Sequence, residues 1–363
     1  MKVKLTEICQ PKQWNTLPKS KLEKRGYPVY GANGIIGYYN EYNHEYPTIL
    51  ITCRGATCGT VNISKEKAYI NGNAMCLDKL SNKVLLKYLY YYLKFYNFKN
   101  VISGSAQPQI TIENLQKLYV KITDITKQQK IVDSLEKIDK IITIRKKQLE
   151  KMDLFVKSLF IELFGSQVDN PYNFEKGIIK DVVNEVKYGT SSPANDNGIY
   201  PYLRMGNITY DGQLDLTNLK YITINDKELD KYIVKKGDVL FNRTNSKELV
   251  GKTCVFNLDE PMIIAGYIIR VRTNNRVIPE YLSAVLNSKY GKQTLFDMCK
   301  SIVGQANINA QELQKIKLLI PPIEIQLKYK SYLVQIDKSK LAIQQSLEKL
   351  EILKKSLMQE YFG

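Results

Sequence analysis

The sequence predicts an α+β protein in which two similar mixed α/β domains are separated by two long antiparallel helices, paired as a coiled coil with pseudo-two-fold symmetry. The first observation behind this prediction is a repeat, because residues 107–165 return 198 positions later, at residues 305–363, without a gap. The second is a heptad pattern of apolar residues inside each copy. The third is a looser likeness between the segments that precede the two copies. Together they indicate a tandem duplication.

The repeat is clearest towards its end. Residues 149–151 (Leu-Glu-Lys) match residues 347–349, and Phe164-Gly165 matches Phe362-Gly363. Glycine directly after a helical segment is a common helix stop. The copied part is therefore predicted to be a long helix with a defined end.

Apolar residues in each copy recur at alternating spacings of four and three, which is typical of a coiled-coil seam. A single amphipathic helix packed on a globular core is the alternative, but it does not explain two matched copies. Arg145, Lys340 and Lys354 interrupt the pattern. The predicted seam residues are Ile131, Leu135, Ile138, Ile142, Leu149, Met152, Leu159, Leu333, Ile336, Ile343, Leu347, Leu350 and Leu357.

These patterns divide the chain into a first domain (1–126), a first long helix (127–165), a second domain (166–323) and a second long helix (324–363). A helix of about 38 residues is roughly 57 Å long, whereas the domain that joins the two helices is on the order of 40 Å across. An antiparallel pair allows this domain to connect neighbouring helix ends. We therefore expect antiparallel helices with the two domains at opposite ends.

The two domains correspond loosely in sequence. Tyr27-Pro28 corresponds to Tyr200-Pro201, and each pair precedes a turn rich in glycine and asparagine. Residues 50–54 correspond to residues 240–243, and each segment reads as a strand that ends in an arginine, Arg54 or Arg243. This alignment predicts that the two arginines are equivalent.

Composition points to a polyanionic partner. The formal net charge is +17, and residues 1–126, with 17 basic and 8 acidic side chains, carry +9 of it. Such an excess favours binding to nucleic acid or to an acidic membrane surface. No apolar run approaches the roughly 20 residues that span a bilayer, and the first residues lack the apolar core of a signal peptide. We expect a cytoplasmic protein.

Known catalytic and metal-binding patterns are missing from the sequence. The six cysteines form no CxxC pair and His44 is the single histidine, which argues against a zinc site. No phosphate-binding GxxxxGK[ST] loop is present. Glu185-Val-Lys187 has the spacing of a nuclease motif, but the upstream acids Asp169 and Asp181 complete no convincing set. We expect no catalytic residues and no metal.

Over essentially its whole length, the sequence resembles the specificity subunits of Type I restriction-modification enzymes. The alternation of globular segment and long helix carries the resemblance, together with the Phe-Gly helix ends. The supporting strings are residues 30–37 (Tyr-Gly-Ala-Asn-Gly-Ile-Ile-Gly), 236–240 (Lys-Gly-Asp-Val-Leu), 304–308 (Gly-Gln-Ala-Asn-Ile) and 321–326 (Pro-Pro-Ile-Glu-Ile-Gln). The first copy departs from this pattern, because residues 123–124 are Thr-Asp where the second copy has Pro321-Pro322.

The resemblance implies that the two domains are target-recognition domains, each reading one half of a bipartite double-stranded DNA target. The helices would act as a spacer and would dock the methyltransferase (modification) subunits, two of them, with restriction subunits completing the complex. S-adenosylmethionine, ATP and Mg²⁺ are expected in the partner subunits, and no cofactor is expected in this chain.

Candidate DNA-binding residues lie in loops where the two domains correspond. Lys and Arg bind phosphates, while Arg, Asn, Gln, Ser and Thr can also read base edges. A structural turn or cap is the alternative role for each residue, and Arg54 and Arg243 are the preferred readers. The candidates are Tyr30, Asn33, Arg54, Thr57, Ser105, Gln107 and Gln109 in the first domain, and Tyr202, Arg204, Asn207, Arg243, Asn245, Ser246, Lys247, Gln305 and Asn307 in the second.

Two other functions stay open. A self-contained nuclease or methyltransferase would need the motifs that the sequence lacks. A coiled-coil adaptor with incidental charge would bind duplex DNA without the steep salt dependence that phosphate contacts produce.

Overall fold

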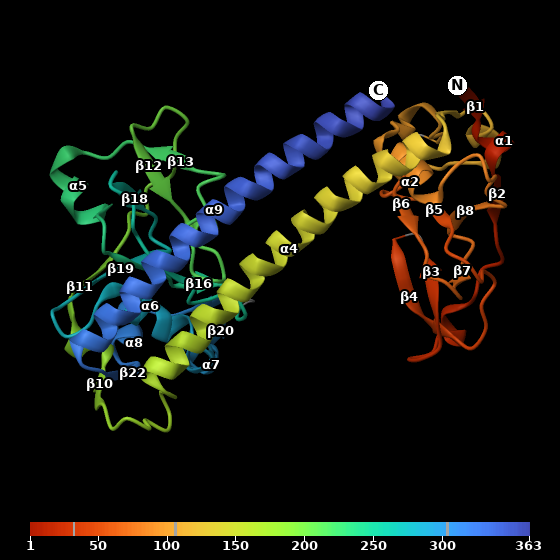
Figure 1. Cartoon of the computed structure of the whole chain (residues 1–363). Coiled ribbons are helices and arrows are strands. Elements are labelled where there is room, and N and C mark those ends of the chain that lie inside the picture. The colour runs from red at the N-terminus through yellow and green to blue at the C-terminus, as the bar shows by residue number, and fades with distance from the viewer. Residues whose placement is uncertain (32, 105–106, 303–304) are drawn as a thin grey trace. The chain divides into compact units, whose positions relative to one another are not determined.

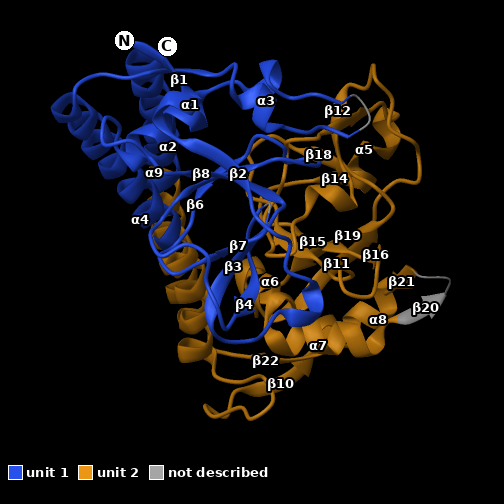
Figure 2. Cartoon of the chain, turned by 90° about the vertical axis from the view of Figure 1, so that its right-hand side faces the viewer, with its two compact units in different colours: residues 1–147, 343–363 blue, residues 148–342 orange. Residues whose placement is uncertain are grey.

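The computed structural model describes residues 1–31, 33–104, 107–302 and 305–363. The chain divides into two compact units (Figures 1 and 2). Unit 1 consists of residues 1–147 and 343–363, and unit 2 consists of residues 148–342. Each unit contains a mixed α/β globular part and a stretch of both long helices.

The described strands of unit 1 form a four-stranded sheet of order β2-β8-β5-β6, a three-stranded sheet of order β4-β3-β7 and the pair β1-β9. The elements of its globular part are β1 (Lys2–Lys4), α1 (Leu5–Ile8), β2 (Gln10–Gln13), η1 (Lys19–Lys21), β3 (Tyr27–Gly31), β4 (Gly34–Tyr39), β5 (Ile49–Thr52), β6 (Val61–Ile63), β7 (Tyr69–Ile70), β8 (Ala74–Asp78), α2 (Leu86–Phe95), η2 (Phe98–Asn100), α3 (Ile112–Leu115) and β9 (Tyr119–Lys121). Strand β5 (Ile-Leu-Ile-Thr) is buried along its whole length, and Tyr88, Leu89 and Leu93 of α2 share a core with its Ile49 and Ile51.

The described strands of unit 2 form four-stranded sheets of order β11-β19-β15-β17 and β13-β12-β18-β14, a three-stranded sheet β16-β21-β20 and the pair β10-β22. The elements of its globular part are β10 (Glu175–Ile178), η3 (Ile179–Val182), β11 (Val183–Tyr188), β12 (Tyr200–Leu203), η4 (Met205–Asn207), β13 (Lys220–Ile222), α5 (Asp226–Tyr232), β14 (Ile233–Val234), β15 (Val239–Asn242), β16 (Thr244–Asn245), β17 (Thr253–Val255), β18 (Met262–Ile264), β19 (Ile268–Thr273), α6 (Pro279–Asn287), α7 (Lys289–Met298), β20 (Lys300–Ile302), β21 (Gln305–Asn307), α8 (Ala310–Gln314) and β22 (Lys317–Ile320).

The two globular parts have the same plan. In each unit the main sheet places its first strand beside the last of the four, followed by the second and third in chain order. In each unit a second sheet contains one parallel pair of strands, β3 with β7 in unit 1 and β12 with β18 in unit 2. The predicted fold class, two similar mixed α/β domains with two long helices, is confirmed.

The long helices are α4 (Ile125–Phe164) and α9 (Ile323–Phe362), and within each unit they run antiparallel. In unit 1, Asp139 pairs with Lys354 and the later residue Lys146 pairs with the earlier Glu351. In unit 2, Asp153 of α4 pairs with Lys340. The two lysines that interrupt the heptad pattern therefore each reach a carboxylate on the opposite helix.

The predicted seam residues turn inward on both helices. Buried residues are Ile131, Leu135, Ile138, Leu159, Ile336 and Ile343, and half-buried residues are Ile142, Leu149, Met152, Leu333, Leu347, Leu350 and Leu357. None of these side chains lies on the exposed face of its helix. The exposed apolar residues of α4, such as Leu154 and Phe155, fall between the seam positions.

Each helix ends in a buried phenylalanine. Phe164 closes α4 in the core of unit 2, with its ring 4.7 Å from Tyr281 and 5.3 Å from Tyr329. Phe362 closes α9 in the core of unit 1, with its ring 5.5 Å from Tyr88. Gly165 follows Phe164 with a φ of +66°, a conformation that favours glycine, and a Cβ there would lie 2.4 Å from Pro171. The matched Phe-Gly strings therefore mark equivalent helix ends.

A buried glutamine fixes the start of each long helix. Gln128 accepts a hydrogen bond from the Leu85 amide and donates to the Lys83 and Thr123 carbonyls. Gln326, which is 198 residues later, accepts from the Ile278 amide and donates to the Arg276 and Pro321 carbonyls. Both residues are completely buried. The same three-bond arrangement therefore occurs in both units.

Candidate nucleic-acid interface

In unit 2, several predicted residues gather where strand β15 ends. Ile308 donates its amide to the Arg243 carbonyl at 2.9 Å, and the Arg243 amide donates to Tyr267 at 2.9 Å. The Arg243 guanidinium lies over the ring of Tyr188 at 4.8 Å. The Nε of Arg243 is buried without a hydrogen-bond partner among the described residues. The backbone and the aromatic ring thus hold this arginine in one orientation.

The short sheet β16-β21-β20 continues this surface. Thr244 pairs with Asn307 across the ladder, and its hydroxyl donates to Asn307 Oδ1 at 3.0 Å. Lys247 lies 4.1 Å above the half-exposed ring of Phe296. Gln305 and Asn307 are exposed, whereas Asn245 and Ser246 are half-buried. The predicted residues Arg243, Asn245, Ser246, Lys247, Gln305 and Asn307 are therefore brought together.

Two further lysines of unit 2 lie beside this surface, Lys252 directly before strand β17 and Lys292 in helix α7. Lys252 is buried and donates to the Met205 carbonyl at 2.7 Å. The ammonium of Lys292 lies 4.7 Å from the ring of Tyr210, and burial lowers its pKa to about 8, with Asp211 opposing and Lys252 adding to this shift. Burial lowers the pKa of Lys252 as well. Neither lysine could be recognised from the sequence, because an isolated Lys carries no motif.

In unit 1, Arg54 and Gln109 lie opposite each other in an isolated β-bridge after strand β5. Together with Gln13, Ile110, Thr111, Ile112 and Glu113 they line a cavity of about 250 Å³. Gln13 donates to the sulfur of Cys53 at 3.0 Å and to the Gly72 carbonyl at 3.2 Å. Arg54, Gln107 and Gln109 are exposed. Polar side chains that can read bases thus surround a cavity in the first domain as well.

The structure corrects the predicted equivalence of Arg54 and Arg243. Ile110 donates its amide to the Cys53 carbonyl, as Ile308 does to the Arg243 carbonyl, and residues 110 and 308 differ by the repeat offset of 198. Arg243 is thus equivalent to Cys53, and Arg54 is equivalent to Thr244. The alignment of Leu50 with Leu240 is confirmed, but the predicted equivalence of the two arginines was wrong by one position, because both segments offer an arginine near the same place.

The remaining predicted residues have varied positions. Tyr30 and Tyr202 are buried, and their hydroxyls bond to the backbone at Lys65 and at Thr190 and Ser192, respectively. Asn207 is buried and donates to the Asp215 carbonyl. Arg204 donates to the Asn218 carbonyl, and Thr57 donates to Asn33. Ser105 lies outside the described residues. The buried tyrosines and Asn207 therefore hold turns of the fold rather than facing solvent.

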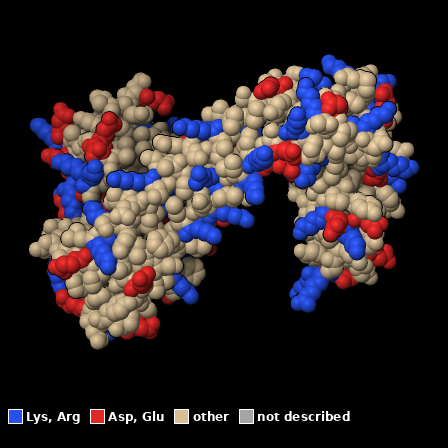
Figure 3. Space-filling model, in the orientation of Figure 1, with Lys and Arg blue, Asp and Glu red and all other residues tan. Residues whose placement is uncertain are grey.

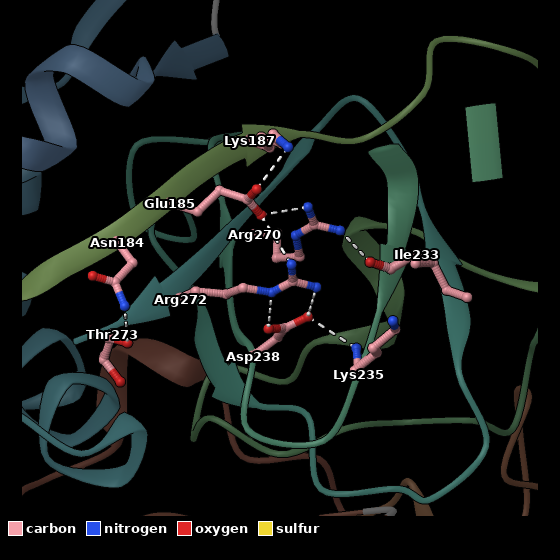
Figure 4. Close-up of polar contacts among 9 residues, drawn as sticks. All are labelled: Asn184, Glu185, Lys187, Ile233, Lys235, Asp238, Arg270, Arg272 and Thr273. Carbon is pink, nitrogen blue, oxygen red and sulfur yellow. Dashed lines mark hydrogen bonds and ion pairs between the residues drawn. The ribbon is translucent and has the colours of Figure 1, made fainter. Parts of the chain in front are cut away.

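The Glu185-Val-Lys187 segment belongs to an ion network in the main sheet of unit 2 (Figure 4). Glu185 pairs with Lys187, Arg270 and Arg272, and Asp238 accepts from Arg272 at 2.8 Å. Arg270 is fully buried and also donates to the Ile233 carbonyl. Asp181 caps the amide of Ile178 at 2.8 Å. The carboxylates of Glu185 and Asp181 are therefore bonded to other protein groups, and the Glu185-Val-Lys187 segment stabilises the sheet. The ion pair with Arg272 also gives Asp238, which belongs to the 236–240 string, a structural role.

Protonation within this network is set by competing effects. Burial by itself raises the pKa of Glu185, but hydrogen bonds from Lys187 and Arg270 and the charges of Arg270 and Arg272 bring it below its ordinary value. The hydrogen bond to Asp238 raises the pKa of Arg272. Both shifts favour the charged forms of Glu185 and Arg272 at neutral pH.

One trio of potential metal ligands occurs among the described residues, namely His44, Cys76 and Asp78. The Asp78 carboxylate already accepts from Trp14 at 3.0 Å and contacts His44 Nε2 at 2.9 Å. Burial raises the pKa of the Cys76 thiol well above its ordinary value. The carboxylate of Asp78 is therefore already bonded to protein groups, and the Cys76 thiol is buried in an apolar cluster.

Comparison with known proteins shows which family this chain belongs to. The model of the Type I restriction modification DNA specificity domain matches residues 1–153 and again residues 171–353. Since these matches cover most of the sequence, the chain belongs to the Type I restriction-modification DNA specificity family. The predicted resemblance is confirmed.

Individual relatives agree with the family match. The chain is 29% identical over 196 residues to a Methanocaldococcus jannaschii protein named as the MjaX specificity subunit of a type I restriction enzyme, covering 53% of this chain and 46% of that protein. It is 22% identical over 249 residues to the EcoKI specificity subunit of Escherichia coli, covering 63% of this chain and 53% of that subunit. The chain thus spans about half the length of these curated relatives.

The fold is also found in a solved structure. A Type I restriction-modification S subunit from M. genitalium has a TM-score of 0.67 with 16% sequence identity, and the match covers 100% of this chain and 96% of that chain. Within the described residues, no helix is long and apolar enough to cross a membrane.

Proposed function

We propose that the chain is the DNA-specificity subunit of a Type I restriction-modification complex, in which each globular domain reads one half of a bipartite duplex target. The observation that carries this proposal is that polar and cationic side chains gather at the same point of the duplicated fold, after strand β5 in unit 1 and after strand β15 in unit 2. Two half-sites at a fixed separation require two such sites on one chain.

Charge supports a nucleic-acid ligand. Lysine and arginine side chains are distributed over both units and along the helices on the face shown in Figure 3. The lysines beside the unit 2 surface that solvent reaches, Lys247 and Lys292, would neutralise phosphates and supply affinity without sequence preference. Arg, Asn, Gln and Thr at the two strand ends would then supply base recognition.

The long helices would space the domains and dock two methyltransferase subunits. Exposed apolar side chains support this role, because large apolar groups on a helix face commonly mark protein contacts. In unit 1 these are Ile141 and Ile144 of α4 and Ile352 of α9; in unit 2 they include Leu154 and Phe155 of α4. The restriction subunits would also be recruited to this complex.

This chain would contribute no catalytic group. S-adenosylmethionine, ATP and Mg²⁺ would be used by the partner subunits. The engagement of Glu185, Lys187 and Asp181 in structural bonds supports this assignment. Activity of the purified chain alone with Mg²⁺ or S-adenosylmethionine would contradict it.

The test is to map methylated adenines in the genome of a host that carries the complete system, with and without this chain. We expect a two-part motif with a fixed spacer that disappears when the chain is deleted. An unchanged methylation map would reject the proposal. A chain that binds duplex DNA equally at low and high salt would instead support a coiled-coil adaptor.

A further inference from the structure

The main sheets of the two units can be aligned residue by residue from their hydrogen-bond registers. Gln13 and Ile51 both face Met75 in unit 1, and Tyr188 and Phe241 both face Ile269 in unit 2. Gln13 is therefore equivalent to Tyr188, just as Ile51 is to Phe241. The backbone pairing gives the register within each sheet, and the repeat offset between Ile110 and Ile308 anchors one unit on the other.

The loops that follow extend this alignment. Cys53 is equivalent to Arg243 because their carbonyls accept from Ile110 and Ile308, respectively. The bridge between Arg54 and Gln109 corresponds to the ladder pair of Thr244 and Asn307. Four pairs of positions thus coincide, and we call them the matched quartet: Gln13 with Tyr188, Cys53 with Arg243, Arg54 with Thr244, and Gln109 with Asn307.

The four positions of the quartet make the same contacts in both units, but they carry different residues. The first two positions touch each other in both units, as Gln13 on the sulfur of Cys53 and as Arg243 over the ring of Tyr188. The last two positions face each other in both units. No residue type is shared between the units at any of the four positions. By contrast, the adjacent exposed positions Gln107 and Gln305 are identical and also differ by 198.

This pattern distinguishes positions that hold the fold from positions that could contact bases. Duplicated positions that make the same contacts in both copies can keep their residues, as Gln128 and Gln326 do. Positions that touch different bases must differ between the two domains, since each base pair presents its own donors and acceptors in the major groove. The outer side chains of the quartet are also available, because Gln13, Arg54, Gln109, Tyr188 and Asn307 are all exposed.

We propose that the matched quartet determines which bases each domain reads, so that the identities at these four positions set the difference between the two half-sites. This inference rests on the proposed function and adds the residues that carry its specificity. Arg54 and Gln109 line the unit 1 cavity and can form the bidentate contacts that guanine and adenine accept. In unit 2 the corresponding contacts fall to Arg243, Thr244 and Asn307.

The experiment exchanges the exposed pair between domains in the full chain. One variant carries Arg54→Thr with Gln109→Asn, and the reciprocal variant carries Thr244→Arg with Asn307→Gln. The control is Tyr119→Lys, which gives the exposed end of β9 the residue found at the equivalent position, Lys317, of β22. Each chain replaces the wild type in the host, and methylated adenines are mapped.

We expect the first variant to change the base preference in the first half of the motif by roughly tenfold or more at the affected positions. The second half and the spacer should be unchanged, and the reciprocal variant should change only the second half. The control should keep the wild-type motif. Wild-type motifs from both exchange variants would overturn the proposal.

If a variant gives no methylation in the host, its DNA specificity is measured with the purified chain. The purified chain is used to select from duplexes randomised across one half-site, with its thermal unfolding compared with that of the wild type. Selection of a new half-site supports the proposal, whereas selection of the old one, or of none by a folded chain, overturns it. If the paired exchange does not fold, Gln109→Asn alone, which shortens one exposed side chain, is tested against the same criteria. A wild-type chain that yields no motif rejects the proposed function instead.

Discussion

Unit 1 and unit 2 share their helix attachments but differ inside their main sheets. Both units bury a helix-starting glutamine with the same three hydrogen bonds, and both bury a helix-ending phenylalanine among aromatic rings. In contrast, the register that aligns the sheets places Cys76 of unit 1 at the position of Arg270 of unit 2. The first is a buried thiol in an apolar cluster, and the second is a buried cation in an ion network.

The difference indicates which contacts a duplicated domain must keep. The side-chain amide of Gln128 or Gln326 bonds one backbone amide and two backbone carbonyls, and no other side chain of the same size can replace all three bonds. Both copies therefore retain glutamine at this position. A sheet interior can be filled by apolar packing or by paired charges, provided that the charges are fully bonded. The attachment of the helices is therefore the fixed part of each unit, and the sheet is the variable part.

The largest expected effect comes from the helix-end phenylalanines. Phe164→Ala and Phe362→Ala should each destabilise their own unit by about 3–5 kcal/mol, because a large ring is lost from a closed core. Hydrogen exchange should show faster opening of α6 after the first change and of α2 after the second. The control Phe155→Ala removes a half-exposed ring from α4 and should change exchange little. Equal loosening of both units by either change would contradict their separate cores.

The buried glutamines should give the next largest effect. Gln128→Leu and Gln326→Leu would each leave a buried amide and two carbonyls without partners, at a cost of about 3 kcal/mol. Because the bonding is the same, the two losses should agree within about 1 kcal/mol. Denaturant unfolding followed by hydrogen exchange measures both, with the exposed Gln129→Leu as the control. A loss in one unit alone would show that the two attachments are not equivalent.

Acid should affect the units differently. The pKa of Glu185 is lowered in the folded state, so its ion pairs stabilise unit 2 above the carboxyl's unfolded pKa and this stabilisation is lost as the pH falls through the folded value. Glu185→Gln should cost unit 2 about 1–2 kcal/mol at pH 7 and progressively less towards pH 3, after allowing for partial exposure of the carboxylate. Unit-resolved exchange over this pH range is the measurement. A cost independent of pH would refute the charge-based explanation.

The smallest effect should come from the lysines in the helix seam. Asp153→Asn removes the partner of Lys340 in unit 2, and Asp139→Asn removes the partner of Lys354 in unit 1. These pairs lie at the helix surface, so each change should cost less than about 1 kcal/mol and the cost should shrink at high salt. Thermal unfolding at low and high salt tests this. A larger loss that persists in salt would mean that the seam depends on these pairs.

The sequence predicted the features that repeat locally along the chain. Heptad spacing, the 198-residue offset and the Phe-Gly ends identified the helices and the duplication, since each is a short-range pattern. Gln128 and Gln326 are also 198 residues apart and could have been recognised as a matched pair. Their structural role could not be predicted, because it depends on backbone partners that the sequence does not identify. The ion network of Arg270 and Glu185 joins residues far apart in sequence and was missed for the same reason.

The interface was predicted less well than the fold. Arg243, Gln305 and Asn307 lie close together, as expected. Tyr30, Tyr202 and Asn207 are instead buried in structural roles, because the residue types that bind ligands near a turn are also those that stabilise the turn. Gln13 and Tyr188 were missed since they lie on a strand distant from the loops that they join. The strands were aligned correctly at Leu50 and Leu240, but Arg54 and Arg243 were paired because they are the same residue type, and the backbone hydrogen bonds place them one position apart.

The most direct test of two separate reading sites is the sensitivity of an arginine variant to each half of the target. The full chain and its Arg243→Ala variant are titrated with the mapped duplex and with duplexes in which one half-site is scrambled. We predict that Arg243→Ala weakens cognate binding far more than binding to unrelated duplex. We also predict that scrambling the second half then has little further effect, while scrambling the first half still does. Wild-type affinity for the cognate duplex, or equal loss of sensitivity to both halves, would contradict the account.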